Sequence, residues 1–224
     1  MNKKRRVPKF RRATPAVRRE ALVEATLRCL KKHGHGGVSV RRISAAAGVS
    51  IGLINHHFPS KASLIAETYE TLALSLQDSI RARAEDSAAL PRARLSDFFR
   101  ASFAPEILDP QLFNVWVVFW SMVAHSPEIR AVHDRTYGKY RSILEALLAE
   151  LVKSGAAPAL KLRCAAIALS ALLDGLWVEL SLSSATFQPR EAIAICEDWV
   201  NALCSGAFPR MLRNSRRHSG RKSP

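Results

Sequence analysis

Apolar residues recur every three or four positions along nearly the whole chain after residue 14, and no segment keeps the two-residue alternation of a strand. The longest such run begins at Lys61, where Leu64, Ile65 and Leu72 continue a pattern that lasts to about Ala84. Proline and glycine fall between the runs, where helices commonly end. The pattern predicts an all-α protein.

Short helices are expected before this long one. Pro15 begins the first helix, which ends at the glycine-rich break of residues 33–37. Ser39 suits the cap of a second helix, because its hydroxyl can accept a hydrogen bond from a backbone N–H at the helix start. Gly48 ends that helix, and Ser50 caps a third one.

Two short helices around a glycine-containing turn are typical of the helix-turn-helix, whose second helix enters the DNA major groove. In the third helix only Ile54 and Phe58 need to face inward, which leaves the other side for DNA. A helical hairpin with polar, solvent-facing residues is the alternative. The residues expected to contact DNA are Ser39, Arg42, Ser50, Ile51, Gly52, Leu53, Asn55, His56 and Lys61.

Further helices are expected after the long one, separated by prolines and by Gly155. Their approximate ranges are 91–104, 110–125, 127–154, 158–184 and 189–205.

The net charge of +15 is concentrated at the ends of the chain. Residues 1–12 hold seven Lys or Arg and residues 210–224 hold six, with no acidic residue in either segment. Residues 13–63 hold eight basic and two acidic groups, whereas residues 64–209 hold thirteen basic and seventeen acidic groups. We therefore expect a disordered basic arm (1–12), a helix-turn-helix domain (13–63), a second helical domain (64–209) and a disordered basic tail (210–224). The arm can also contact phosphates or a minor groove.

The four cysteines form no CxxC pair and lie in apolar helical patterns, as reduced core thiols do. No secretory signal precedes the first helix, and no apolar run is predicted to span a bilayer. These features predict a cytoplasmic protein without a membrane partner.

The stretch "AAAGVSIGLINHHFPSK" resembles the DNA-binding signature of the TetR family of bacterial regulators, and "EATLRCLKKHGHGGVSVRRIS" is similar to the family's preceding helices. The resemblance implies that Ile51, Gly52 and Leu53 stand at base-reading positions, an apolar set suited to thymine methyl groups. The family usually has tyrosine where this chain has Asn55, and that residue commonly contacts phosphate. We therefore favour phosphate over adenine as the partner of Asn55.

The second domain resembles the branch typified by BetI, the choline-responsive repressor of glycine betaine synthesis. The similarity is carried by "FNVWVVFWSMVAHSPEIRAVHDRTYGKYRSILEALL" and "ALLDGLWVELSLSS". It implies a ligand-binding and dimerisation domain, and choline or another quaternary ammonium compound as a possible effector.

Aromatic residues at helical spacing mark a candidate ligand site. Phe113, Trp116 and Trp120 share one helical face, Phe119 lies beside it, and Trp177 on a later helix can close a cage. Aromatic ring faces attract a quaternary ammonium cation. Core packing is the alternative for such a stripe.

Asp174 lies in the apolar segment "AIALSALLDGLWVELSL", three residues before Trp177. A carboxylate in such surroundings needs a partner. That partner is either a structural arginine such as Arg130, Arg135 or Arg141, or a cationic ligand.

Small residues at helical spacing allow another helix to approach closely, and the resemblance implies a two-fold four-helix interface. The predicted interface residues are Ala168, Ala171, Leu172, Gly175, Ile193, Cys196, Val200 and Leu203. Dimerisation lets two short recognition helices read successive major-groove faces.

The sequence holds no phosphate-binding loop, GxSxG, HExxH or paired-carboxylate motif. We expect no catalysis, no cofactor and no metal site. The leading hypothesis is a homodimeric repressor that a small cationic effector releases from a double-stranded operator. The alternatives are a regulator controlled by a protein partner, and an architectural DNA-binding protein that uses its basic tails.

Overall fold

The computed structural model describes residues 14–85, 90–183 and 185–208, and the predicted basic arm and tail lie outside these ranges. Within them all regular structure is helical, so the all-α prediction is confirmed. The helices are α1 (Pro15–Gly37), α2 (Val40–Ala47), α3 (Ile51–His57), α4 (Lys61–Glu85), α5 (Pro91–Ser102), α6 (Pro110–Val123), α7 (Pro127–Lys153), α8 (Leu162–Leu182) and α9 (Pro189–Cys204).

Helix boundaries differ from the predictions at two places. Helix α1 continues to Gly37, and the predicted break appears as a kink at Gly34, whose backbone has φ 60° and ψ −167°. Helix α8 begins at Leu162 and not near residue 158. Pro158 disfavours helical geometry in the residue before it, so the segment between α7 and α8 remains a loop.

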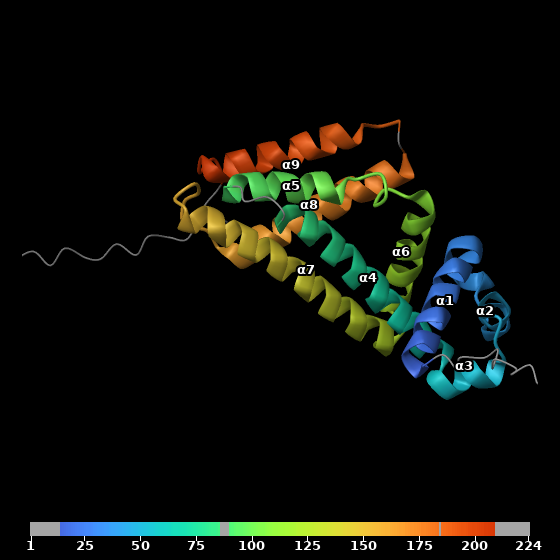
Figure 1. The fold of residues 1–224 in the computed structure, drawn as a ribbon. Helices are drawn as coiled ribbons and strands as arrows, with labels where there is room; N and C mark the ends of the chain where they lie inside the picture. The colour runs from blue at the N-terminus through green and yellow to red at the C-terminus, as the bar shows by residue number, and fades with distance from the viewer. Residues whose placement is uncertain (1–13, 86–89, 184, 209–224) are drawn as a thin grey trace, which may run out of the picture.

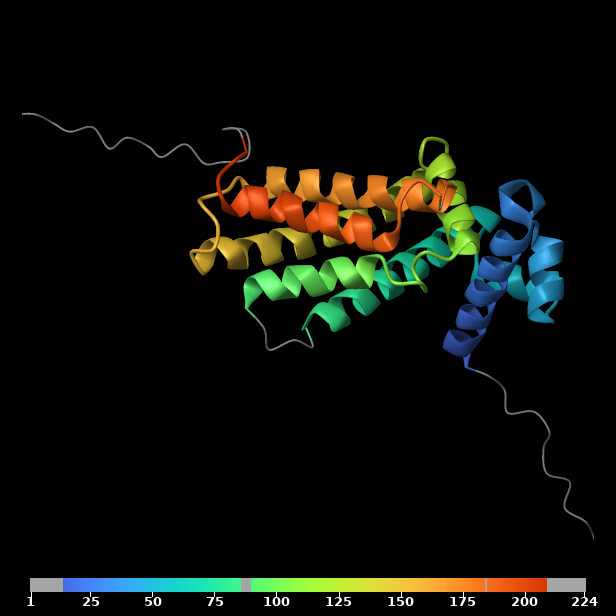
Figure 2. The same ribbon diagram turned by 90° about the horizontal axis from the view of Figure 1, so that it is seen from above.

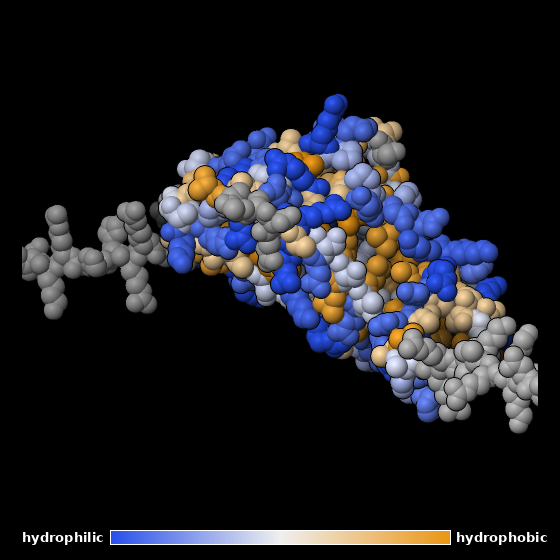
Figure 3. Space-filling view, viewed as in Figure 1, coloured by the Kyte–Doolittle hydropathy of each residue, from blue (hydrophilic) through white to orange (hydrophobic). Residues whose placement is uncertain are grey.

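The three N-terminal helices α1–α3 pack together at one end of the molecule, and α4 leads from them into a bundle with α5–α9 (Figure 1). Helices α8 and α9 run alongside each other over one side of that bundle, as the view from above shows (Figure 2). Apolar residues are visible over α6, between the bundle and the N-terminal unit (Figure 3).

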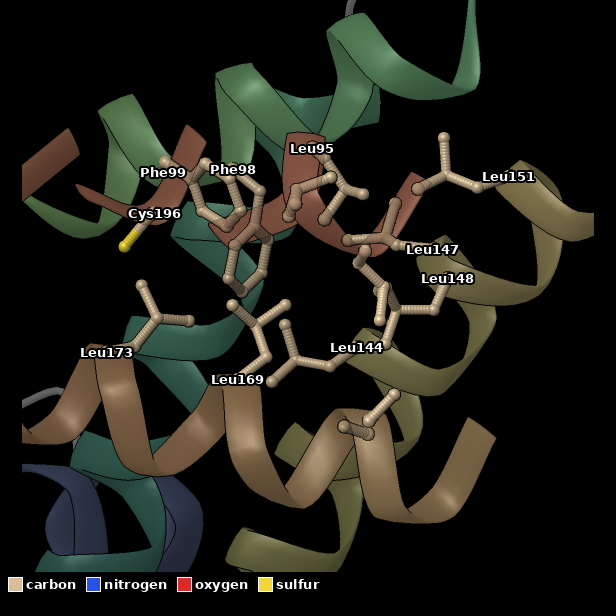
Figure 4. Packing of buried hydrophobic residues seen from close by; sticks show 14 of the residues in the cluster. Leu95, Phe98, Phe99, Leu144, Leu147, Leu148, Leu151, Leu169, Leu173 and Cys196 are labelled. Carbon is tan, nitrogen blue, oxygen red and sulfur yellow. The ribbon is translucent and has the colours of Figure 1, made fainter. Parts of the chain in front are cut away.

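The bundle has its own hydrophobic core, in which side chains from five helices interlock (Figure 4). Phe98 and Phe99 of α5 meet Leu144 of α7 and Leu169 of α8 at its centre, and each of these side chains is buried. Cys196 of α9 lies in the same cluster. This core fixes the far end of the bundle.

A second hydrophobic cluster joins the N-terminal unit to the near end of the bundle. It contains Ile43 and Ile54 of α2 and α3, but also Tyr69 of α4 and Trp116 and Phe119 of α6. The predicted boundary between residues 63 and 64 therefore falls within the first turn of α4, and the hydrophobic core continues across it.

Polar contacts reinforce the same junction. The Arg19 guanidinium of α1 forms an ion pair with Glu67 of α4 and lies 4.3 Å from the centre of the Phe58 ring. The ammonium of Lys31 lies 3.0 Å from Oδ2 of Asp109, the N-cap residue of α6. Ion pairs therefore connect helix α1 to both α4 and α6.

Helix α8 bears on the prediction that no apolar run spans a bilayer. Its length and a mean hydropathy of 1.6 are sufficient, by composition only, for a helix that crosses a membrane. A core helix of a soluble protein passes the same test, so the observation is weak evidence for a membrane span. Here the buried side of α8 packs against α7 and α9.

Gly48 sets the angle between α2 and α3, because it caps α2 in the left-handed region at φ 65°. Nothing lies within 4 Å of a Cβ added there, so substitution causes backbone strain alone. We expect Gly48→Ala to lower the free energy of unfolding by about 1–2 kcal/mol. Gly52→Ala, inside α3 and with an open site, should instead raise it by about 0.5–1 kcal/mol.

Urea unfolding at one protein concentration measures both variants. Shifts of the same sign would contradict this account of the turn.

Candidate DNA-binding surface and effector pocket

The two predicted serine caps are present in the structure. The Ser39 hydroxyl accepts a hydrogen bond from the Arg42 N–H at 3.3 Å, and the Ser50 hydroxyl accepts one from the Leu53 N–H at 3.3 Å. The hydroxyl of Ser44 donates to the carbonyl of Val49 across the turn. These bonds fix where α2 and α3 begin, and hence which side chains α3 turns outward.

Helix α3 is divided into an inner and an outer side. Ile54 is buried, and so is Phe58 directly after the helix, whereas Leu53 is half-buried. The exposed residues of the helix are Ile51, Gly52, Asn55 and His56. This separation gives α3 one surface that its own fold does not use.

Two predicted basic DNA contacts flank this surface. Arg42 is exposed on α2. Lys61 begins α4, and its Nζ donates to the carbonyl of Val38 at 3.4 Å while the side chain remains exposed. Cationic groups beside a recognition helix suit phosphate contacts.

A cavity of about 100 Å³ opens inside the bundle, between α4, α6, α7 and α8. Aromatic rings make up much of its wall, and Asp174 is the acidic residue in its lining. A cavity of about 150 Å³ holds benzene, so the site suits a ligand of few heavy atoms. The aromatic lining residues are Phe103, Trp116, Trp120, Tyr137, Tyr140 and Trp177.

The environment of Asp174 is unusual for a carboxylate. Burial raises its pKa to about 6, against the opposing effects of a hydrogen bond from Tyr137 and the more distant charge of Arg141. Arg135 instead pairs with Glu70 at 3.1 Å, and Arg130 donates to the carbonyl of Ala124. No ion pair to Asp174 is present among the described residues, so the hydrogen bond from Tyr137 and the distant charge of Arg141 offset its desolvation only in part.

The structure brings together most of the predicted cage and excludes two members. Trp116, Trp120 and Trp177 line the cavity, and the rings of Trp120 and Trp177 meet edge to face at 6.1 Å. Phe113 lies behind Trp177 at 5.2 Å, and Phe119 is fully buried against Tyr69. Neither phenylalanine lines the cavity, because each ring packs on an aromatic side chain of a neighbouring helix.

Sequence reasoning missed the contribution of α7. Tyr137 and Tyr140 also line the cavity, and burial is the main cause that raises the pKa of both phenols. Both phenols are therefore neutral near pH 7. Their spacing of three residues on one helix was the available signal, but nothing in the sequence pairs α7 with α8.

The predicted dimer residues fall into two groups. Ala171 and Gly175 are exposed on α8, and Ala168, Leu172 and Ile193 are half-buried. The other three must be corrected: Cys196, Val200 and Leu203 are buried in the chain's own core and cannot meet a partner. Helix α9 is apolar on more than one side, and these residues form the inner side.

The outer sides of α8 and α9 nevertheless carry exposed apolar residues. On α8 they recur at helical spacing, and Ile167 is 41% exposed. On α9 the side chain of Ile195 is 44% exposed. We call this set the α8/α9 face; its members are Cys164, Ile167, Ala171, Gly175, Leu182, Ala194 and Ile195.

Comparison with known families identifies both halves of the chain. Residues 22–68 match the family described as "Bacterial regulatory proteins, tetR family". Residues 91–205 match the family described as "BetI-type transcriptional repressor, C-terminal".

Relatives of known name show the same similarity. The HTH-type transcriptional regulator BetI of Rhizobium meliloti is 36% identical over 186 residues, covering 83% of this chain and 89% of the relative. The protein of that name from Burkholderia thailandensis is 32% identical over 191 residues, covering 84% and 93%.

Solved structures of transcriptional regulators have a similar fold. A transcriptional regulator from Pseudomonas aeruginosa PAO1 has a TM-score of 0.82 and 47% identity, covering 89% of this chain and 96% of that one. A regulator from Saccharomonospora viridis in complex with choline has a TM-score of 0.70 and 22% identity, covering 83% and 96%. The second likeness concerns the fold alone.

The partly desolvated charge of Asp174 should lower the stability of the folded protein, in a manner that depends on pH. Its pKa rises from 3.8 in the unfolded chain to about 6 in the folded one. The cost is therefore absent below pH 3.8, grows up to pH 6 and is constant above it. One pKa unit corresponds to about 1.4 kcal/mol, so Asp174→Asn should stabilise the ligand-free protein by on the order of 3 kcal/mol at pH 7.5.

Urea unfolding at pH 7.5 and pH 5 compares the variant with the original chain. The advantage of the variant should shrink at pH 5. A variant less stable at pH 7.5 would show that Asp174 has a stabilising partner.

Proposed function

The chain belongs to the TetR family of bacterial regulators, in its BetI-type branch, and on this premise we propose that a small quaternary ammonium compound, such as choline, releases it from a palindromic operator. As a transcriptional repressor of this family it is not an enzyme. The observation that carries the proposal is a half-buried carboxylate, Asp174, that lines an aromatic cavity and forms no ion pair among the described residues.

The chemistry of the cavity favours a cation that does not need hydrogen bonds. Each ring face contributes about 0.5–2 kcal/mol to such a cation, and Trp116, Trp120 and Trp177 offer several. The Asp174 carboxylate adds a charge in a desolvated site, where electrostatic attraction is stronger than in water. A neutral ligand would leave that charge unpaired.

An open, partly aromatic cavity also favours a small effector over control by a protein partner alone. A regulator without a ligand would gain stability by filling this space with side chains. The complex of the Saccharomonospora viridis regulator with choline is compatible with our proposal, since that protein has the same fold.

On the DNA side, we propose that α3 enters the major groove with Ile51, Gly52 and Leu53 toward the bases. Asn55 and His56 then lie beside phosphates, together with Ser39, Arg42, Ser50 and Lys61. The exposed side of α3 and the basic charge of residues 13–63 support this assignment. The proposed domain division is the predicted one, with residues 64–209 as the ligand-binding and dimerisation domain.

Family members dimerise, and we propose that the α8/α9 face forms the interface. Ala171 and Gly175 let two copies of α8 approach closely, with Ile167 and Ile195 exposed on the same face. Such a dimer would present its two α3 helices about 34–36 Å apart, which suits a palindromic site. An effector that changes this spacing would weaken binding to the operator.

The first test is a gel-shift assay on DNA from upstream of the protein's own gene, with choline, betaine aldehyde and unrelated cations. We expect choline or a compound of its class to release the DNA at pH 7.5, and to act less well at pH 5, where Asp174 is protonated. Asp174→Asn should require at least about tenfold more ligand, because the ion pair is lost.

A pair of tryptophan variants controls for folding. Trp120→Leu removes a cavity wall whose indole N–H has no hydrogen-bond partner among the described residues, and Trp199→Leu changes a tryptophan that packs on Phe208, away from the cavity. Only the first should impair release. If no cation releases the DNA, the quaternary ammonium proposal is wrong and the repressor assignment stands.

The dimer interface has a separate test. Ala171→Arg places a bulky charge on the α8/α9 face and should convert the dimer to monomers and weaken operator binding at least about 100-fold. Ala146→Arg, an equal change on the exposed side of α7, should leave both unaffected. Sedimentation and gel shifts measure the two effects, and a dimeric Ala171→Arg variant would exclude this face as the interface.

A further inference from the structure

The wall that α4 contributes to the cavity differs from the walls that carry the tryptophans. The rings of Trp120 and Trp177 and the carboxylate of Asp174 belong to α6 and α8. Both α4 and α8 pack on α7, and the cavity lies between them. A ligand in the cavity therefore meets two chemically different surfaces. The lining residues from α4 carry neither an aromatic ring nor a charge, and they are Ala73, Leu76, Gln77 and Ile80.

Gln77 is the polar residue of this α4 wall, and a hydrogen bond fixes how its amide is turned. Its Nε2 donates to the backbone carbonyl of Thr136 on α7, at 3.0 Å. A carbonyl oxygen only accepts hydrogen bonds, so an amide turned the other way would place two acceptors against each other. The amide nitrogen of Gln77 is thus held on α7, and its oxygen, Oε1, is left for another partner.

The fold itself does not use this amide oxygen. No group of residues 14–85, 90–183 or 185–208 donates a hydrogen bond to Oε1 of Gln77. Other donors of the cavity lining are engaged elsewhere, because the hydroxyls of Ser102 and Thr136 and the indole N–H of Trp177 donate to backbone carbonyls. Oε1 is therefore an acceptor in the cavity wall that a ligand can satisfy.

The cationic end of the proposed effector belongs at the other wall, because aromatic ring faces and the Asp174 carboxylate stabilise a cation there. The opposite end of the ligand then faces α4. We propose that Gln77 is a specificity-determining residue, whose Oε1 accepts a hydrogen bond from a hydroxyl group on the effector, remote from its cation. The effector class is then a quaternary ammonium alcohol. This inference rests on the proposed function, in which Asp174 and the tryptophans hold the cation.

The rest of the α4 wall would favour an alkyl group over a hydroxyl group. Leu76 and Ile80 offer no hydrogen bond from their side chains, and a hydroxyl buried among such residues loses its contacts with water. A hydroxyl group is accepted without this loss only where an acceptor meets it. Removal of the Gln77 amide should therefore change the preference for hydroxyl over methyl by roughly tenfold.

Two ligands of similar size test this preference. They are choline and propyltrimethylammonium, in which a methyl group replaces the hydroxyl group. Calorimetric titration of the full chain measures the Kd of each ligand for the original protein and for Gln77→Met, a side chain of similar length without the amide. We expect the variant to weaken choline roughly tenfold relative to propyltrimethylammonium. A merely structural role of the bond to Thr136 would weaken both ligands equally.

A matched variant and a second measurement control for folding. Gln111→Met makes the same change on an exposed residue of α6 outside the cavity lining, and it should keep the original preference. Thermal unfolding and operator binding without ligand show whether each variant is folded. A crystal structure of the original protein with choline needs no variant. It should place the choline oxygen about 3 Å from Oε1 of Gln77.

The outcomes separate this inference from the proposed function. Equal weakening of both ligands in Gln77→Met would overturn the role of Gln77 and leave the quaternary ammonium proposal intact. A choline oxygen that the crystal structure places on Asp174 or on another group would have the same meaning. If the original protein binds neither cation, the proposed effector class is wrong and this inference fails with it.

Discussion

The packing of Tyr69 holds the N-terminal unit and the bundle together. Its ring is fully buried, stacks on Phe119 at 4.5 Å and meets Trp116 edge to face at 5.5 Å. Its hydroxyl lies 2.9 Å from Nδ1 of His133 on α7. Three elements of the bundle, α4, α6 and α7, therefore meet at one side chain in the same cluster as the core of the DNA-binding unit.

This shared cluster connects the cavity to the DNA-binding unit through packed side chains. Trp116 contributes to both, because it lines the cavity and packs against Tyr69. Close-packed interiors transmit small displacements and do not absorb them. A ligand that moves α6 would also act on α1 through the Lys31–Asp109 ion pair.

The lining of the cavity includes one residue, Asp174, whose charge lowers the stability of the folded protein. Desolvation raises the pKa of Asp174 to about 6, and the tyrosines that surround it are neutral at that pH. An apolar residue at this position would avoid the cost of a buried charge. Local features that oppose stability commonly occur at functional sites, and the negative charge of Asp174 is opposite to that of the cationic effector that we propose.

The sequence by itself determined the local features: the helices, the capping roles of Ser39 and Ser50, and the end of the second helix at Gly48. Each depends on residues only a few positions apart. Periodicity also showed which residues of α6 and α9 are apolar, but both helices are apolar on more than one side. Only the tertiary structure decided that Cys196 faces the core while Ile195 faces outward, and that Phe119 packs on Tyr69 while Trp120 lines a cavity. The choice depends on which helices become neighbours, and a single helix does not contain that information.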